Sequence, residues 1–103
     1  MAANALNNFA SAYPRSVLTP AARFYEGSSY YAIRDFQGAI SRLERMVSSY
    51  PQDPQAGDAL LVVAGSQLEL NNIEGSKQTL QRVIQQYPNS PAADTAQERL
   101  KMY

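Results

Sequence analysis

Histidine, cysteine and tryptophan are absent from this chain of 103 residues, and its nine basic residues balance its nine acidic ones. The length predicts one small domain, and the zero net charge argues against the basic surface of a nucleic-acid-binding protein. Without histidine or cysteine, the chain has no imidazole or thiolate ligand for zinc and no Ser–His or Cys–His catalytic pair. The composition therefore predicts a non-enzymatic protein with no cofactor, no metal and no nucleic-acid partner.

The sequence contains no recognisable membrane or export segment. Its longest uninterrupted apolar run, residues 59–64, is far shorter than the roughly 20 residues that a membrane-spanning helix needs. The first eight residues lack the charged and apolar regions of a secretory signal. If the protein is exported, we expect its signal peptide to have been upstream and removed, with Met1 as an added starting residue.

A repeat is visible from the spacing of three Tyr-Pro pairs. Tyr13-Pro14, Tyr50-Pro51 and Tyr87-Pro88 are each 37 residues apart. Each pair closes a stripe of apolar residues at i, i+3, i+4 and i+7, which is one face of an α-helix. The three stripes are Leu6, Phe9, Ala10 and Tyr13; Leu43, Met46, Val47 and Tyr50; and Leu80, Val83, Ile84 and Tyr87.

In chain order, the first predicted helix covers residues 2–12 and ends at the first Tyr-Pro pair, because proline disfavours helix at the residue before it. The second covers 20–33 and is expected to begin at Thr19-Pro20, with Thr19 as its N-cap. The third covers 36–49, with Asp35 as N-cap, and ends at the second Tyr-Pro pair.

The fourth predicted helix covers 54–70 and is expected to begin at Asp53-Pro54, where Asp53 would be the N-cap. The fifth covers 73–86; Asn71 is expected in the left-handed conformation and Asn72 as the N-cap. The sixth covers 91–102 and begins at Ser90-Pro91. Gly38 and Gly75 occupy matching positions at helix starts, where we expect them to allow close approach of two helices.

These elements predict an all-α solenoid built from helix pairs. With the first helix of each pair called A and the second B, the order is B, A-B, A-B, A. The single domain, residues 1–103, would contain a half repeat (1–14), two repeats (15–51 and 52–88) and a terminal helix (89–103). Such stacks need about three repeats for stability, which this arrangement approaches.

The repeat resembles the tetratricopeptide repeat (TPR), which implies a right-handed superhelix. The resemblance lies in the order of residue types: a small residue, two aromatic residues, a small residue, a bulky residue and a proline. The period of 37 residues is longer than the usual TPR period of about 34. In the first repeat these are Gly27, Tyr30-Tyr31, Phe36, Ala39, Leu43 and Pro51, and in the second Ala64, Leu68, Ile73, Ser76, Leu80 and Pro88.

The longer period and the junctions are similar to the C-terminal domain of the cell-division coordinator CpoB (Tol-Pal system protein YbgF) family. The similarity is carried by residues 27–36, 50–53 and 87–100. It implies a periplasmic domain that binds a TolA-like protein and penicillin-binding-type peptidoglycan synthase machinery, and that helps coordinate wall synthesis with outer-membrane constriction. It also implies an upstream coiled coil that forms trimers.

The resemblance also places a binding groove on the concave face formed by the A helices. Bulky residues flank a small one at i, i+4 and i+7 in two of these helices, which suits an amphipathic or extended apolar segment. The predicted groove residues are Phe24, Ser28, Tyr31, Asp58, Leu61, Gly65, Leu68, Glu98 and Met102. The stripe is equally compatible with core packing, although a second stripe of Ala22, Tyr25, Ser29 and Ile33 could serve that purpose.

Charges replace the family's usual apolar residues near Arg23 and Glu26. These two residues are three apart and would form an ion pair at the solvent edge, or would contact an absent upstream helix or a partner. Three other interpretations of the whole chain stay open: a TPR scaffold of an outer-membrane assembly lipoprotein, an enzyme accessory domain, and a self-assembling structural domain whose unpaired end helices complete each other.

Overall fold

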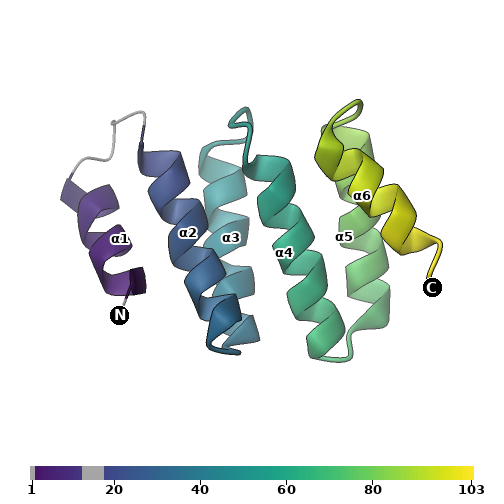
Figure 1. Cartoon of the computed structure of the whole chain (residues 1–103), viewed down its shortest axis with the longest axis horizontal. Helices are drawn as coiled ribbons and strands as arrows, with labels where there is room; N and C mark the ends of the chain where they lie inside the picture. The colour runs from purple at the N-terminus through teal and green to yellow at the C-terminus, as the bar shows by residue number, and fades with distance from the viewer. Residues whose placement is uncertain (1, 13–17) are drawn as a thin grey trace.

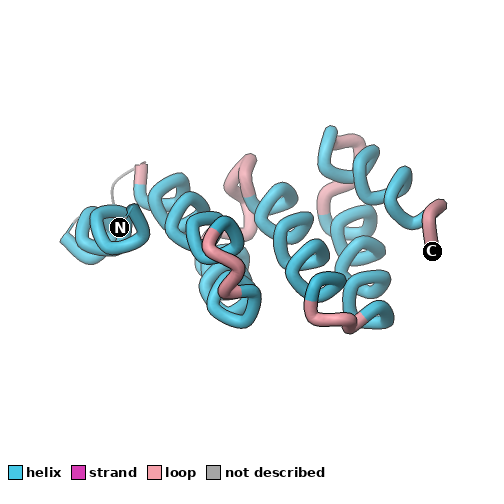
Figure 2. The backbone as a smooth tube through the Cα atoms, turned by 60° about the horizontal axis from the view of Figure 1, so that its bottom comes forward, coloured by secondary structure: helices cyan, strands magenta, loops and turns pink. Residues whose placement is uncertain are grey.

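Six helices and no strand are present in the computed structural model, which describes residues 2–12 and 18–103 (Figure 2). The predicted all-α solenoid with a B, A-B, A-B, A order is therefore confirmed. The helices are α1 (Ala2–Ala12), α2 (Thr19–Ala32), α3 (Phe36–Ser49), α4 (Ala56–Glu69), α5 (Ile73–Gln86) and α6 (Pro91–Leu100).

The helices lie side by side in two layers. Figure 1 shows α2, α4 and α6 in the nearer layer, with α3 and α5 behind them. Each helix packs against its neighbours in sequence, and within the nearer layer α2 also contacts α4 and α4 contacts α6. The domain is accordingly elongated, at 41 × 28 × 16 Å, with its termini at opposite ends (Figure 1).

The core is centred on α4, because this helix packs between α3 and α5 and is flanked by α2 and α6. Almost every side of α4 is therefore covered, which explains why residues 59–64 form an uninterrupted apolar run. Its buried residues are Ala56, Gly57, Ala59, Leu60, Leu61, Val63, Ala64 and Ser66.

The apolar stripes that end at Tyr50 and Tyr87 face this core, whereas α1 contacts only α2 among the described helices. Leu43, Leu80 and Val83 are completely buried, and Ala10 of α1 is 1% exposed. The helical spacing in the sequence thus identified the buried face of α3 and of α5. The first pair, Tyr13-Pro14, lies outside the described residues.

Close approach of two helices is allowed at Gly27, which is neither of the two glycines predicted for this role. A Cβ atom at Gly27 would lie 2.5 Å from Leu43 Cγ, so the missing side chain lets α3 pack tightly against α2. At Gly38 and Gly75, the Cβ would instead collide with the capping side chains of Asp35 and Asn72. The predicted role of Gly38 and Gly75 is wrong, because they make room for the N-caps of their own helices.

Three predicted N-caps are confirmed by hydrogen bonds. Asp35 Oδ1 accepts from the Gly38 N–H at 3.0 Å, and Asn72 Oδ1 accepts from the Gly75 N–H at the same distance. Ser90 Oγ caps α6 by accepting from the Ala93 N–H. Each bond satisfies one of the free N–H groups at a helix start. Asn71 adopts the predicted left-handed conformation, with φ of 63°.

Two other predicted caps are wrong. Asp53 Oδ1 accepts from the Gln55 N–H at 2.9 Å, so Asp53 and Pro54 form a turn ahead of α4, whose N-cap residue is Gln55. Thr19 is the first residue of α2 and is 1% exposed, and the N-cap residue of this helix is Leu18. Local sequence did not reveal that Thr19 is buried.

The Arg23–Glu26 ion pair is partly buried, which corrects its expected place at the solvent edge. The Glu26 side chain is only 7% exposed, and Arg23 Nη1 lies 3.3 Å from its Oε1. The same Nη1 donates to Asn7 Oδ1 at 2.8 Å, so Arg23 connects α1 to α2. A buried carboxylate needs such a partner, because loss of hydration is costly for an unpaired charge.

A tyrosine joins the two described junctions between helix pairs. Tyr87 follows α5, and its hydroxyl donates to the Pro51 carbonyl at 2.8 Å. Burial raises the pKa of the Tyr87 hydroxyl above its ordinary value, and the nearby positive charge of Arg82 partly opposes this. The hydroxyl therefore keeps its donor proton throughout the neutral pH range.

Tyr87→Phe is expected to lower the free energy of unfolding by about 1 kcal/mol, because it removes one hydrogen bond. The raised pKa means that the unfolded chain ionises first, so the contribution of Tyr87 is present below about pH 10 and lost above it. Urea unfolding should show a smaller difference between wild type and Tyr87→Phe as pH rises from about 9 to about 11. An equal difference at every pH would contradict this role.

Candidate functional site

A groove of about 510 Å³ opens between the C-terminal halves of α4 and α6. The first half of α5 forms its floor, and the end of α2 adds one side chain. It is lined by Tyr31, Ala64, Gly65, Leu68, Glu69, Ile73, Ser76, Leu80, Arg99, Met102 and Tyr103. A mostly apolar concavity of this size is typical of a binding site.

Large apolar side chains surround this groove and remain exposed. We call Tyr31, Leu68, Ile73, Met102 and Tyr103 the apolar rim; their exposed fractions run from 37% for Tyr31 to 78% for Met102. Exposed apolar residues are ordinary when scattered, but a group of them around one concavity marks an interaction surface. Covering them with a partner would remove apolar area from water, at about 25 cal/mol per Å².

The groove floor is rigid because its residues belong to the core. Leu80 is fully buried, and Ser76, 1% exposed, donates its Oγ–H to the Ala64 carbonyl at 2.9 Å. The Ser76 hydroxyl also lies 2.6 Å from the hydroxyl of Tyr103, which holds that ring at the groove edge. The tyrosine ring thus presents its apolar body to the groove while its polar end is satisfied.

The aromatic side chain of Tyr31, from α2, lies beside Gly65 of α4. A Cβ at Gly65 would lie 3.7 Å from Cε2 and from the hydroxyl oxygen of Tyr31, so the ring rests directly on α4. On its other side, Tyr31 packs edge-on against Phe36 with ring centroids 5.5 Å apart. The ring is therefore held between two elements before any partner arrives.

The two charged groups of the groove differ in their pairing. Glu69 lies 3.6 Å from Arg34, which follows α2. Arg99 Nη1 donates to the Leu61 carbonyl at 3.2 Å, and no carboxylate within the described residues lies within 4.0 Å of its guanidinium. The groove thus contains one partly buried positive charge without an opposite charge.

The structure brings together four of the nine predicted groove residues: Tyr31, Gly65, Leu68 and Met102 all line the groove. Phe24 and Leu61 do not, because Phe24 packs against the core cluster and Leu61 is 9% exposed within it. Replacing Phe24 would therefore disturb the core as well as any binding.

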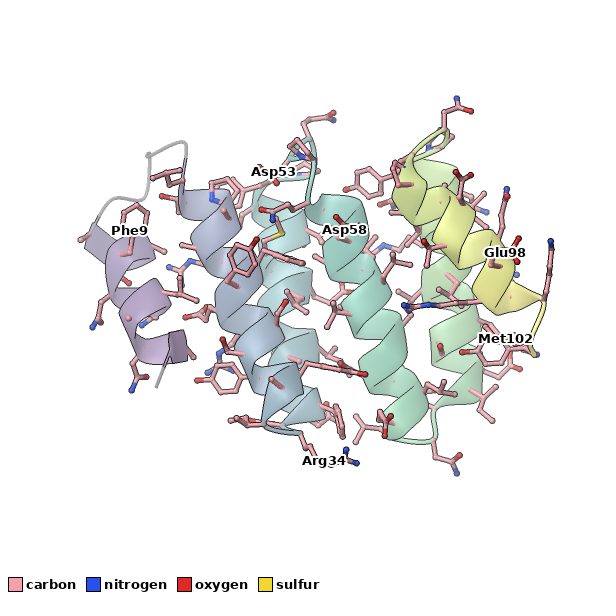
Figure 3. The ribbon with its side chains drawn as sticks, in the orientation of Figure 1. Phe9, Arg34, Asp53, Asp58, Glu98 and Met102 are labelled. Carbon is pink, nitrogen blue, oxygen red and sulfur yellow. The ribbon has the colours of Figure 1, made fainter. Side chains whose placement is uncertain are left out.

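The remaining predicted groove residues also lie away from the groove. Asp58 lies near Asp53, at the start of α4, whereas Met102 lies beyond α6 toward the other end of α4 (Figure 3). Glu98 is exposed and forms an ion pair with Lys101. Ser28 is partly buried, and its Oγ has no hydrogen-bond partner among the described residues. The expected packing stripe is also wrong in part, since Tyr25 is 53% and Ile33 57% exposed, while Ala22 is buried.

Sequence reasoning missed Ile73, Arg99 and Tyr103. It assigned the whole binding surface to concave positions of the A helices, whereas Ile73 begins a B helix and Tyr103 follows the last helix. The repeat period could have indicated Ile73, because Ile73 occupies the same repeat position as the large apolar Phe36, 37 residues earlier. Phe36 and Ile73 are the first residues of α3 and α5. An apolar residue at this position suggests contact with the end of the A helix that precedes it.

A second, wider concavity of about 890 Å³ lies between the two described junctions. Four prolines, Tyr87, Asp53 and Asp58 are among its lining residues. Gly57 permits the close approach there, because its Cβ would lie 3.0 Å from Ala92 Cβ. Asp58 lies in the first turn of α4, where a carboxylate is stabilised by the helix dipole, so the acidic residues there have a structural explanation.

Groups that could hold a metal ion are not found in the described part of the chain: no three acidic, histidine or cysteine side chains cluster there. Within the same residues, no helix has both the length and the apolar content to cross a bilayer.

Comparison with protein families gives two matches. Two models described as tetratricopeptide repeat match the chain, one over residues 30–100 and the other over residues 2–54. A search of curated proteins found no match. The first model covers more than half of the chain and includes both described junctions, and the helix-pair geometry agrees with it. The chain therefore belongs to the tetratricopeptide repeat family.

Proposed function

We propose that this chain is a protein-interaction domain of the bacterial periplasm that associates with the Tol-Pal machinery through the groove between α4 and α6. Domains of the tetratricopeptide repeat family generally mediate protein–protein interactions and are typically non-enzymatic. The observation that carries the proposal is the apolar rim, five large exposed side chains around one concavity with a rigid floor.

The specific partners are proposed from the resemblance of residues 27–36, 50–53 and 87–100 to the CpoB family. On that basis the groove binds a segment of a TolA-like protein, and the domain acts together with penicillin-binding-type peptidoglycan synthases during outer-membrane constriction. The apolar rim would supply the anchors, and polar residues around it would fix the register of the bound segment.

The outer face of α6 favours docking over head-to-tail self-assembly. The exposed residues of α6 are Pro91, Asp94, Gln97 and Glu98, followed by Lys101. A polar face offers little apolar area for contact with a second copy of the chain. Sedimentation of the chain over a wide concentration range should give a monomer; growing oligomers would support the self-assembly alternative.

Leu68→Glu is expected to weaken binding of a TolA-like periplasmic fragment at least about tenfold, because a carboxylate replaces an apolar anchor in the groove. Leu70→Glu is the matched control: Leu70 is 40% exposed against 47% for Leu68, but it does not line the groove. Calorimetric titration of the TolA fragment into each variant checks this, with circular dichroism to establish equal helix content.

Three results are informative. Loss of binding in Leu68→Glu alone supports the groove as the site. Equal loss in both variants, or loss in neither, would exclude the groove as the contact surface. If wild type binds neither the TolA fragment nor a penicillin-binding synthase fragment, the Tol-Pal proposal fails, whereas the family assignment stands.

A further inference from the structure

A small cavity between α2 and α3 is lined by four charged side chains. Its volume is about 140 Å³, and it shares no lining residue with the groove. Arg23 and Glu26 line it from α2, and Arg42 and Arg45 line it from α3. Three positive charges against one negative charge give the cavity a positive potential, which attracts anions.

Two of the three arginines have no acidic partner. Arg42 and Arg45 are three positions apart, so they lie on the same face of α3. Neither forms an ion pair within the described residues. The guanidinium of Arg42 is held in place, because it lies 3.8 Å from the centre of the Tyr30 ring and its Nη1 donates to the Gly38 carbonyl at 3.4 Å. A guanidinium stacked in this way keeps donors along its edge for an oxyanion.

The repeat explains why Arg45 has no acidic partner. Its counterpart 37 residues later is Arg82, which forms an ion pair with Glu44 at 2.9 Å. The residue that corresponds to Glu44, 37 residues earlier, is Asn7. Asn7 is uncharged and accepts a hydrogen bond from Arg23 at 2.8 Å. The carboxylate that neutralises Arg82 is therefore replaced by an amide at the equivalent place beside this cavity.

The buried charges of the cavity are not required by the fold. In α4, the counterparts of Arg23 and Glu26 are Leu60 and Val63, and both are completely buried. The same helix packing is thus achieved with apolar residues in the next repeat. Because burying charged groups is costly, their presence at this one place indicates a site for a ligand.

Glu26 restricts which anion can bind. Its side chain is only 7% exposed; Oε1 pairs with Arg23, and Oε2 accepts no hydrogen bond from the described residues. A carboxylate oxygen accepts from a ligand hydroxyl but repels a fully deprotonated oxygen. Inorganic phosphate keeps at least one hydroxyl at neutral pH, whereas sulfate has none. A phosphate monoester, whose second pKa is about 6, has mostly lost its hydroxyl proton.

The size of the cavity also suits a small anion. A volume of 140 Å³ corresponds to about five water molecules at about 30 Å³ each, which is room for one phosphorus and four oxygen atoms. A nucleotide or a sugar phosphate is much larger than this space.

We propose that the cavity between α2 and α3 binds inorganic phosphate. The guanidinium groups of Arg23, Arg42 and Arg45 donate to the phosphate oxygens, and Glu26 accepts from the phosphate hydroxyl. This inference goes beyond the proposed function and does not depend on it, since the two sites have no residue in common.

Calorimetric titration of the whole chain with sodium phosphate, at neutral pH and low ionic strength, tests the ligand. Sodium sulfate and phosphoserine are titrated under the same conditions. We expect phosphate to bind at least about tenfold more tightly than either, because only phosphate donates to Glu26. In Glu26→Gln the preference for phosphate over sulfate should disappear, since the neutral amide no longer repels sulfate.

Arg42→Met and Arg45→Met are each expected to weaken phosphate binding about tenfold, because each removes charge-assisted hydrogen bonds. Arg82→Met is the matched control: it removes the counterpart of Arg45, which does not line the cavity, and should leave phosphate binding unchanged. Circular dichroism establishes equal helix content in all variants.

Asn7→Glu separates ligand binding from a structural role. It supplies the carboxylate that Glu44 supplies to Arg82, so it should compete with phosphate and weaken binding about tenfold. The free energy of unfolding should not fall, because Arg45 gains an ion-pair partner.

Four results would overturn the inference. Wild type that binds no phosphate at millimolar concentrations would exclude the site, and equal losses in Arg45→Met and Arg82→Met would show a general charge effect. Sulfate binding as tight as phosphate binding would exclude the role of Glu26 and the choice of phosphate. Tighter binding of phosphoserine would assign the cavity to a phosphorylated partner instead. Each result leaves the test of the groove unaffected.

Discussion

Leu43→Ala is expected to lower the free energy of unfolding by about 3 kcal/mol, within the range of about 2–5 kcal/mol for a buried leucine. Leu43 is completely buried, and its Cγ occupies the space left open by Gly27 of α2. Removing the side chain leaves a cavity that α2 and α3 cannot close, because both helices are held by other contacts. Leu80→Ala, the equivalent change one repeat later, should cost a similar amount.

Urea denaturation followed by circular dichroism at 222 nm measures this effect. Leu70→Ala is the control, since Leu70 is 40% exposed, and its loss should stay below about 1 kcal/mol. Equal losses at positions 43 and 70 would mean that burial in the α2–α3 contact does not govern stability. The comparison is independent of any binding partner.

Arg23→Met is expected to destabilise the domain by about 2 kcal/mol, because it leaves the carboxylate of Glu26 buried without its ion-pair partner. Breaking a fully buried pair costs about 3–5 kcal/mol, and the smaller value is expected because Arg23 is itself 26% exposed. The change also removes the hydrogen bond from Arg23 to Asn7, so α1 should separate from α2 more easily.

The double variant Arg23→Met with Glu26→Gln provides the control, because the neutral amide no longer needs a cation. It should recover more than half of the lost stability in the same denaturation experiment. If Arg23→Met alone is as stable as wild type, one of the two arginines that line the same small cavity, Arg42 or Arg45, must replace it. No recovery in the double variant would show that Arg23 acts through packing rather than charge.

The helices and their order could be predicted from the sequence because the relevant forces are local. Apolar spacing of three and four residues fixes which face of a B helix is buried, and the proline after Tyr50 and Tyr87 ends the helix before it. The caps by Asp35, Asn72 and Ser90 also depend on residues within three positions along the chain. Such contacts have the same geometry in any helix.

The failures at Asp53 and Thr19 show where local rules stop being sufficient. Both precede a proline and so have the pattern of an N-cap, yet Asp53 caps a turn before the helix and Thr19 is buried. Which of two neighbouring residues begins a helix depends on how the preceding connection packs, and that is decided by distant parts of the chain. The buried state of Glu26 is a similar case, since neighbours in sequence do not reveal it.

Sequence by itself determined the repeat, the helix order and the buried face of α3 and α5, because these follow from spacing along a single helix. It could not separate Phe24 and Leu61, which pack into the core, from Tyr31 and Leu68, which line the groove, although all four belong to the same pattern. That difference was decided only by the tertiary structure. Exposure depends on which neighbouring helix covers a side chain, and spacing along one helix does not contain that information.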